Sequence, residues 1–288
     1  MDTYHRIQKA IEYIETNLFE DLKIHHVASQ AFFSPFHFQR MFQAISGFTV
    51  QEYIRNRRLS EAAVLLKKDI PILQIALDCQ YGSQESFTRS FSAFAGIPPS
   101  KYRKSQISLK LQPKMNFLDF KQRMRGEIHV NKPHIVNLSP IHIIGCEYKT
   151  NLNNDAHYEE IPGFYHDFGM NEYYMKIADK LAPGMSYGIA CSFEDDGGFS
   201  FIIGEEAKES NAKLHEPLIH FKIPEGKYAE FKVNGSADMV QNNRRYIYGT
   251  WLPQSNFERR EGPDFEVTDV LGSSYPDKMK INIYIPVY

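Results

Sequence analysis

The sequence predicts a multi-domain protein in which an all-α N-terminal domain with two helix-turn-helix units precedes an α+β C-terminal domain of two βαββ halves. Two observations lead to this prediction. A motif in the first third of the chain recurs 49 residues later. Near Ile135 the hydrophobic pattern changes from helical spacing to the alternation typical of strands. The length of 288 residues also suits two domains.

The repeated motif consists of five residues with identical internal spacing in both copies. The two copies are Phe38, Arg40, Phe42, Gly47 and Tyr53, and then Phe87, Arg89, Phe91, Gly96 and Tyr102. A serine precedes each copy, Ser34 and Ser83, and is expected to cap a helix that the glycine ends. Each predicted helix follows a short helix and a turn, which is the order of a helix-turn-helix unit.

Further helical segments complete the first domain. Apolar residues at helical spacing from Ile7 to Leu18 predict a first helix. Thr49 begins a long helix, Pro71 separates it from the second unit, and Pro98-Pro99 opens a short last helix. We therefore assign residues 1–107 to a helical domain with two helix-turn-helix units, residues 108–134 to a polar linker and residues 135–288 to the second domain.

The net charge of −2 conceals an asymmetry between the two parts of the chain. Residues 1–126 carry 18 Lys and Arg against 11 Asp and Glu, whereas residues 127–288 carry 15 against 24. A basic first part favours a polyanion as its partner. Charge alone leaves chance variation as an equal alternative.

The second domain shows alternating patterns that predict strands at 142–150, 198–205, 218–224, 228–235 and 280–287. A further strand is presumed around Glu266. Helices are predicted at 164–181 and 236–249. The resulting order is β-α-β-β twice, which indicates an α+β domain of two similar halves.

Each helix-turn-helix unit offers side chains suited to reading DNA. Reading the major groove requires base-edge donors and acceptors near the start of an exposed helix. The candidates that share such a face are Phe36, Gln39 and Arg40 in the first helix, and Gln84, Glu85, Thr88 and Arg89 in the second. Gln pairs with adenine, Arg with guanine, and Glu accepts from cytosine. One such helix would be better explained as solvated surface, but two matching helices favour DNA reading.

Over residues 5–105 the chain resembles the AraC/XylS family of transcription regulators. The segments SPFHFQRMF and SQESFTRSF, together with Pro99-x2-Tyr102, look most like the MarA/SoxS/Rob branch. The resemblance implies base contacts from the seven candidates and a monomer bound to one asymmetric site of roughly 20 base pairs. It also implies RNA polymerase as a protein partner, with the sign of regulation left open. The family has Gly where this chain has Gln80, which puts the geometry of the second turn in doubt.

Other basic residues of the first domain are candidates for phosphate contacts, which supply affinity rather than sequence choice. They are Arg55, Arg57, Arg58, Lys101, Arg103 and Lys104. For Arg57 and Arg58 a structural role in salt bridges is an equal alternative.

Residues 135–288 resemble the GyrI-like effector-binding domain. The resemblance rests on the segments 226–231, 251–253, 262–266 and 281–286. It implies a cleft lined by aromatic residues, with a buried glutamate that attracts cationic, aromatic ligands. Glu266 is the candidate for that glutamate, and its predicted wall residues are Tyr148, Tyr187, Phe193, Tyr228 and Trp251. Alternation places Glu266 on the face opposite Phe265 and Val267, although a solvated strand face would explain this residue equally well.

The remaining sequence features exclude or narrow other classes of protein. No apolar run reaches the roughly 18 residues of a membrane helix, and Cys79, Cys146 and Cys191 are expected as free, buried thiols in a bacterial cytoplasm. No metal-binding spacing, nucleotide loop or nucleophile motif occurs, so neither a metal nor a cofactor nor an enzyme is predicted. The alternative is that the second domain is a hydrolase of reactive small molecules, fused to an autoregulatory DNA-binding domain.

Overall fold

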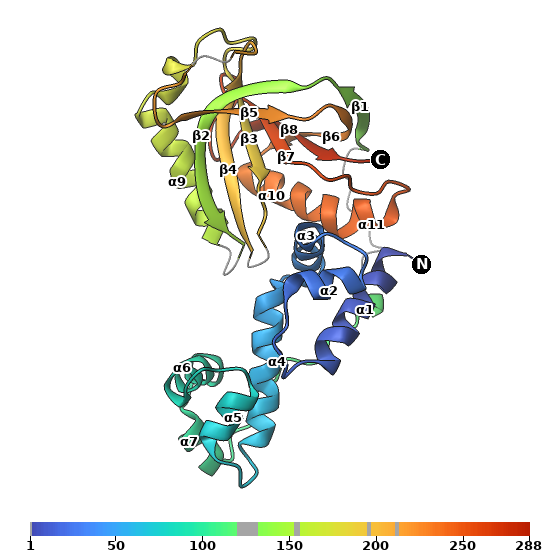
Figure 1. The fold of residues 1–288 in the computed structure, drawn as a ribbon, viewed down its shortest axis with the longest axis vertical. Helices are drawn as coiled ribbons and strands as arrows, with labels where there is room; N and C mark the ends of the chain where they lie inside the picture. The colour runs from blue at the N-terminus through green and yellow to red at the C-terminus, as the bar shows by residue number, and fades with distance from the viewer. Residues whose placement is uncertain (1, 120–131, 153–155, 195–196, 211–212) are drawn as a thin grey trace. The chain divides into compact units, whose positions relative to one another are not determined.

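The computed structural model describes residues 2–119, 132–152, 156–194, 197–210 and 213–288. The chain divides into two compact units, Met1–Arg125 and Gly126–Tyr288. In the described residues the first unit is helical, and the second is built on an eight-stranded sheet (Figure 1). The predicted fold class is therefore confirmed.

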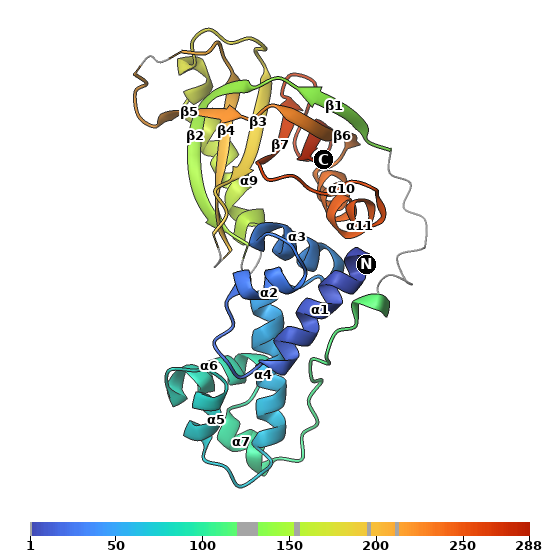
Figure 2. The same cartoon turned by 45° about the vertical axis from the view of Figure 1, so that its right-hand side comes forward.

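The helical unit is organised around α4 (Val50–Leu65), which connects the two helix-turn-helix units. In Figures 1 and 2 the first group of helices gathers at the start of α4 and the second group at its end. The first group is α1 (Thr3–Thr16), α2 (Ile24–Gln30) and α3 (Pro35–Ser46). The second group is α5 (Ile72–Asp78), α6 (Gln84–Ala95) and α7 (Pro99–Lys104).

The predicted start and stop signals of α3 and α6 are present. The side chain of Ser34 accepts the backbone N–H of His37, and that of Ser83 accepts the N–H of Ser86. Gly47 and Gly96 end the two helices in the left-handed conformation, with φ of 78° and 72°. Only a residue without Cβ adopts this conformation at little cost, which explains a glycine at both helix ends.

The aromatic residues of the repeat form equivalent core contacts in both units. In the first unit the ring of Phe42 lies 5.8 Å from that of Phe38 and 5.7 Å from that of Tyr53. The corresponding rings of the second unit, those of Phe87, Phe91 and Tyr102, are separated by 5.6 Å and 5.5 Å. Core packing and helix ends thus account for every repeated residue except the arginines.

The two turns share a backbone feature at residues that are not glycine. Gln80 has a φ of 66°, and Phe32, at the same position of the first turn, has a φ of 56°. The backbone N–H groups of the next residues, Tyr81 and Phe33, donate to the carbonyls of Ala76 and Ala28. The turn with Gln80 therefore has the same backbone geometry as the turn with Phe32.

Part of the segment predicted as a linker packs on the helical unit. The ring of Phe117 lies 5.3 Å from that of Phe42, and its N–H donates to Gln8. The N–H of Met115 donates to the hydroxyl of Tyr53. Residues 120–131 of the same segment lie outside the described part of the chain.

The sheet of the second unit is antiparallel throughout, in the order β1-β6-β8-β7-β3-β4-β2-β5. The first half of the unit consists of β1 (His134–Leu138), β2 (Ile141–Asn151), α9 (Ala156–Met170), β3 (Met185–Cys191) and β4 (Gly198–Glu206). The second half consists of β5 (Leu218–Ile223), β6 (Gly226–Gly235), α10 (Ala237–Tyr246), β7 (Asp264–Asp269) and β8 (Met279–Pro286). Each half is thus a βαββ unit preceded by a short strand, and that strand pairs with the other half.

Three elements of this unit differ from the sequence-based expectation, and one of them is β1, which was not predicted. The helix predicted at 164–181 is wrong, because α9 ends at Met170 and only a 3₁₀ turn, η2 (Tyr173–Lys176), follows. The helix continues through Pro162, since Ile161, Phe164 and Phe168 pack against the sheet. Strand β3 was not predicted because its residues are buried on both faces, which removes the alternating pattern.

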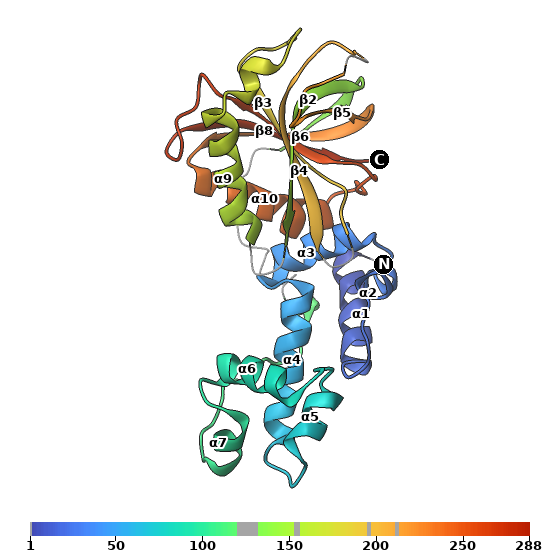
Figure 3. The same cartoon turned by 60° about the vertical axis from the view of Figure 1, so that its left-hand side comes forward.

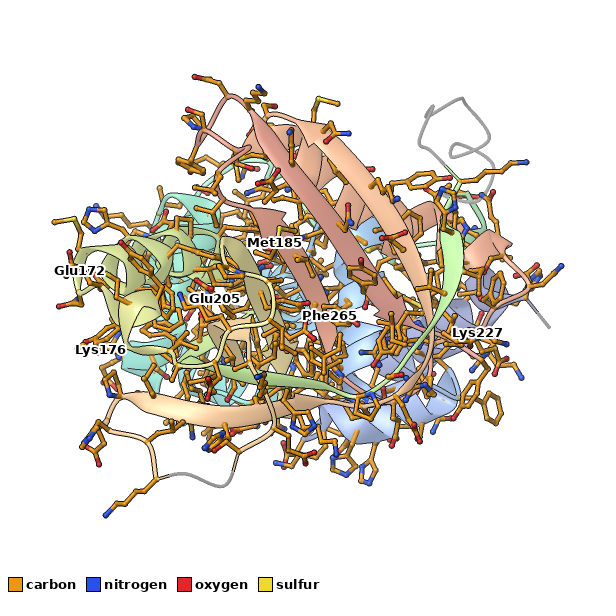
Figure 4. The ribbon with its side chains drawn as sticks, turned by 90° about the horizontal axis from the view of Figure 1, so that it is seen from above. Glu172, Lys176, Met185, Glu205, Lys227 and Phe265 are labelled. Atoms are coloured by element: carbon orange, nitrogen blue, oxygen red, sulfur yellow. The ribbon has the colours of Figure 1, made fainter. Side chains whose placement is uncertain are left out.

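The two faces of the sheet have separate hydrophobic cores. One core contains Phe265, Tyr187 and Tyr228, together with residues of both edge strands β1 and β5, so the sheet curls around it. Figure 4 looks down on this curl, with Phe265 labelled inside it. The other face is covered by α9, which contacts β2 and β4, and by α10, which contacts β6 and β8 (Figure 3).

Candidate DNA-reading helices and effector site

The predicted recognition face of α6 is open to solvent. Gln84, Glu85 and Arg89 are exposed and Thr88 is half-buried, whereas Phe87 and Phe91 on the opposite face are fully buried. Hydrogen bonds from its own backbone N–H and from Ser83 lower the pKa of Glu85. Glu85 is therefore an ionised acceptor at neutral pH, while Gln84 and Arg89 supply donors.

The corresponding residues of α3 are less exposed than those of α6. Phe36 and Gln39 are 6% and 4% exposed, and Arg40 is half-buried. The guanidinium of Arg40 lies 5.9 Å from the centre of the Phe36 ring, within cation–π range. The three predicted residues thus lie together on one side of α3, as the helical spacing requires.

The six basic candidates divide into two groups. Arg57 is buried and paired with Glu15 and Glu61. Arg58 donates to the carbonyls of Leu18 and Glu20, and Arg103 to those of Leu66 and Ile70. These three arginines have structural partners. Arg57 forms the expected salt bridges, whereas the partners of Arg58 are backbone carbonyls. The exposed members of the set are Arg55, Lys101 and Lys104.

In the second unit, the register of the sheet places Glu266 in a row of paired residues that crosses the helix-covered face. In order across the sheet, the row contains Phe231, Ile283, Glu266, Gly188, Ile203 and Cys146. Within the row only Glu266 is charged, and only Gly188 lacks a side chain. The prediction that Glu266 faces away from Phe265 and Val267 is confirmed, since both of those residues lie in the opposite core.

The carboxylate of Glu266 is buried between the two helices. Arg244 of α10 donates to one carboxylate oxygen, and the hydroxyl of Tyr165 of α9 donates to the other at 3.4 Å. Burial and the neighbouring carboxylate raise the pKa of Tyr165 well above its ordinary value, so its hydroxyl remains a donor. Burial disfavours the charged guanidinium of Arg244, but Glu266 outweighs this effect and raises its pKa.

Gly188 provides the space for this cluster. A Cβ at position 188 would lie 2.2 Å from the Tyr165 hydroxyl oxygen, 2.9 Å from the Phe201 ring and 3.2 Å from Glu266 Cγ. Any larger residue would therefore displace the ring of Tyr165 from the carboxylate. The glycine lets an aromatic side chain of α9 reach a charge on the sheet.

A second carboxylate of the same strand holds the chain that follows α10. Asp264, two residues before Glu266, accepts from the hydroxyl of Tyr248 and from Arg259, the latter at 2.8 Å. Tyr248 belongs to a π-helical turn, η3 (Ile247–Trp251), which is followed by α11 (Leu252–Gln254). Turns of this kind are frequent at functional sites. Strand β7 thus contacts α10 and the turn η3, together called the α10 segment (residues 237–251), through two carboxylates, Asp264 and Glu266.

The structure does not bring all the predicted wall residues to Glu266. Tyr187 and Tyr228 are buried in the core on the opposite face of the sheet. Trp251 packs on Phe231, with ring centres 4.9 Å apart, at one end of the Glu266 row. Tyr148 stacks on Phe164 of α9 at 5.2 Å, and Phe193 stacks on Phe199 at 5.4 Å.

A cavity of about 350 Å³ opens on the helix-covered face near Tyr148. Thr150, Glu160 and Phe199 line it as well, and Glu160 accepts a hydrogen bond of 2.6 Å from Thr150. The partner of Tyr148 across the sheet is Phe201, whose ring lies 5.9 Å from that of Tyr165. Aromatic side chains therefore extend from this cavity to the hydroxyl that contacts Glu266.

The other expectations concern thiols, metals and membranes. Cys79, Cys146 and Cys191 are free and buried, and burial raises the pKa of Cys79 to about 12 and that of Cys191 to about 11. Across the described ranges, no three His, Cys, Asp or Glu side chains come together as a metal site. No helix in the described part of the chain is long and apolar enough to cross a membrane.

Sequence reasoning missed Arg244, Tyr165 and Gly188 as site residues. A glycine inside a strand signals close approach of another group, so Gly188 could have been found once β3 was recognised. No local signal distinguishes Arg244 from the exposed Arg245 beside it, because their difference depends on what α10 packs against.

Comparison with known proteins finds separate family matches in the helical unit and in the sheet unit. The family described as integron-associated effector binding protein matches residues 134–287, and the one described as helix-turn-helix domain matches residues 27–105. The right origin-binding protein of Escherichia coli K12 is 28% identical over 304 aligned positions, which cover 100% of this chain and 99% of that protein. The transcriptional regulator Rob of Salmonella typhimurium is also 28% identical, with the same shares covered.

A solved structure shows similarity to part of the chain. It is an integron cassette protein from the mobile metagenome of Vibrio cholerae, 21% identical, with a TM-score of 0.38 over 55% of this chain and 97% of that chain.

A helix-turn-helix unit of this kind joined to an effector-binding domain is the organisation of a transcription regulator. The chain belongs to the integron-associated effector binding protein family through its second unit, and its first unit makes it a Rob-like regulator with an AraC-type DNA-binding domain. Its full-length relatives reported above are named as an origin-binding protein and a transcriptional regulator, and neither name supports the hydrolase alternative.

Proposed function

We propose that this regulator reads one asymmetric DNA site of roughly 20 base pairs as a monomer, through α3 and α6 in successive major grooves. The observation that carries the proposal is the repeat itself. Its aromatic and glycine residues have structural roles in both units, whereas Arg40 and Arg89 lie outside the cores. Two equivalent arginines on two equivalently capped helices are suited to bind guanine.

The proposed base contacts come from Phe36, Gln39 and Arg40 in α3 and from Gln84, Glu85, Thr88 and Arg89 in α6. Since both reading helices belong to one chain, no dimer and no palindromic site is required. The proposed partners are double-stranded DNA and RNA polymerase, the latter resting on the family resemblance alone. A regulator acts where the DNA is, so we place the protein in the bacterial cytoplasm.

Selection of random duplex DNA on the purified full-length protein at about 150 mM salt tests this proposal. We expect an asymmetric motif with two halves about one helical turn apart, roughly 10 base pairs. Enrichment of a palindrome, or retention that depends on salt but on no sequence, would contradict the monomeric reader.

The substitution Arg89→Ala is expected to weaken binding to the selected site by about 1–3 kcal/mol and to relax the preference at one base position. The reason is the loss of a bidentate contact to guanine. Lys101→Ala is the control. Removing an exposed lysine that contacts phosphate should weaken binding equally on all sequences. Titration of both variants against the selected site and single-base variants measures the difference. A uniform loss for Arg89→Ala would reassign this residue to phosphate.

We further propose that the second unit senses a lipophilic cation at Glu266. A carboxylate only 9% exposed, bordered by the rings of Tyr165 and Phe201, favours a cation with aromatic surface. Trp251 and Tyr148 lie on the same face of the sheet, whereas Tyr187 and Tyr228 occupy the opposite core. Phe193 stacks on Phe199, and Phe199 lines the cavity near Tyr148.

Tetraphenylphosphonium is a suitable probe for this site, because its charge is shielded by four rings. We expect wild-type protein to bind it in calorimetric titration and Glu266→Gln to lose most of that binding, since the neutral amide removes the attraction while keeping the shape. Glu261→Gln, at an exposed glutamate of the same unit, is the matched control and should bind like wild type. Equal binding by Glu266→Gln and wild type would exclude this carboxylate as the cation site.

A further inference from the structure

The Glu266 site already contains a cation that belongs to the protein. The guanidinium of Arg244 contacts the carboxylate directly, and its side chain is 31% exposed while that of Glu266 is 9% exposed. Arg244 is therefore the more accessible partner of a pair whose anionic member is buried. A ligand cation and the guanidinium would compete for the same oxygen atoms.

We propose that Arg244 is an internal, displaceable cation that occupies the Glu266 site until a ligand cation replaces it, and that it thereby sets the selectivity of the site. This inference rests on the proposed cation-sensing function. It adds an exchange step: the incoming cation takes over the carboxylate, and the arginine side chain swings into water.

The charge balance of the cluster favours a cation over an anion as the ligand. When a cation replaces Arg244, the buried carboxylate keeps a partner of opposite charge. An anion that recruited Arg244 away would instead leave Glu266 buried without a counter-charge, which is costly. The hydroxyl of Tyr165 could compensate only in part, since it is neutral.

Exchange also explains which cations the site would prefer. The displaced guanidinium regains its hydration, so the exchange costs least when the incoming cation gives up little hydration of its own. Large cations with charge spread over aromatic groups meet this condition, whereas ammonium-like cations hold their water strongly. The rings of Tyr165 and Phe201 beside Gly188 provide the surface against which such a cation packs.

The exchange would release one of the two links between β7 and the α10 segment. Arg244 lies on α10, and the π-helical turn that follows remains held by Asp264 through Tyr248 and Arg259. Ligand binding is therefore expected to loosen the last turn of α10, while the π-helical turn after it stays attached.

Titration of the full-length variants with tetraphenylphosphonium tests the exchange. We expect Arg244→Gln to bind this cation more tightly than wild type by about tenfold or more, where tenfold corresponds to about 1.4 kcal/mol. Arg244→Lys, which keeps a competing charge, should bind much more weakly than Arg244→Gln. Arg245→Gln is the matched control, because it removes an exposed charge from the neighbouring position of the same helix.

Two further measurements keep the result interpretable. Circular dichroism and thermal unfolding of each variant show whether it is folded, and the cation should raise the melting temperature of Arg244→Gln more than that of wild type. Tetraphenylborate, an anion of the same shape, should bind neither protein at the same concentrations.

The outcomes separate this inference from the function on which it rests. Loss of cation binding in Glu266→Gln with no gain in Arg244→Gln would overturn the exchange and leave the cation site in place. Wild-type binding of tetraphenylborate that disappears in Arg244→Gln would also overturn it, because Arg244 would then be the ligand site itself. Absence of cation binding in every variant would overturn both proposals.

Discussion

Replacing Arg57 with alanine is expected to lower the free energy of unfolding of the helical unit by about 3–5 kcal/mol, the cost of breaking a buried ion pair from one side. Arg57 contacts Glu15 of α1 at 2.8 Å and 3.2 Å, Glu61 at 2.9 Å and the carbonyl of Gln112 at 3.0 Å. The substitution leaves the carboxylate of Glu15, whose side chain is 11% exposed, with the hydroxyl of Tyr53 as a hydrogen-bond donor and Lys114 as a nearby positive charge.

Denaturant unfolding followed by far-ultraviolet circular dichroism measures this effect, because the described helices of the first unit contribute much of the signal. The chain has a single tryptophan, Trp251, so tryptophan fluorescence reports the second unit and should be unchanged. Arg55→Ala, at an exposed arginine of the same helix, should shift stability by no more than about 0.5 kcal/mol. A similarly small shift for Arg57→Ala would mean that the pair is not a structural element.

The same pair predicts how the stability of the helical unit depends on pH. Burial raises the pKa of Glu15, but hydrogen bonds from Arg57 and Tyr53 outweigh it and hold the pKa below its ordinary value of 4.5. Since the folded-state pKa is the lower one, the stabilisation is fully present above pH 4.5 and is lost as the pH falls through the folded-state pKa. The stability difference between wild type and Arg57→Ala should therefore shrink in that acidic range.

The substitution Gly145→Ala is expected to destabilise the sheet unit by about 3 kcal/mol, at the upper end of the cost of overpacking. Gly145 of β2 pairs with Gly204 of β4. A Cβ at position 145 would lie 2.2 Å from the carbonyl oxygen of Ile203 and 2.7 Å from the Cα of Gly204. Both atoms belong to the backbone of the sheet, so neither can move aside without breaking the pairing of β2 with β4.

Fluorescence of Trp251 during denaturant unfolding measures this loss, and the helical signal of the first unit supplies an internal reference. Gly163→Ala is the matched control in the same unit, because no atom lies within 4 Å of an added Cβ on this exposed helical glycine. It should be neutral or stabilising by up to about 1 kcal/mol through helix propensity. Equal stability of Gly145→Ala and wild type would show that the two strands can separate locally.

The helical unit was predictable in detail because its signals are local. Ser34, Gly47, Ser83 and Gly96 act on the backbone within one turn of their own position, so their effects can be read without knowing the fold. The repeat added long-range information, since residues that recur at a fixed offset occupy equivalent places in two similar units. Helix start and stop residues and an internal repeat can both be recognised from the sequence alone.

The effector site was predictable only in part. Strand alternation placed Glu266 on the correct face of the sheet. It could not predict which side chains of the covering helices contact the carboxylate. Arg244 and Tyr165 are separated by 79 positions in the sequence and meet at Glu266 only because α9 and α10 cover the same face. The sequence analysis grouped Tyr187 and Tyr228 with Glu266, but the pairing register of the sheet places both in the opposite core.

The sequence by itself determined the two domains, the two capped helices, the repeated core and the face on which Glu266 lies, because propensity, capping and periodicity act between near neighbours. The tertiary structure decided the roles of the charged residues. Arg57 and Arg58 became structural and Arg244 became the partner of Glu266 according to which groups the fold placed beside them. An arginine side chain can pair with water, a carbonyl or a carboxylate at similar local energy. Only the groups that the fold places beside it decide which partner it has.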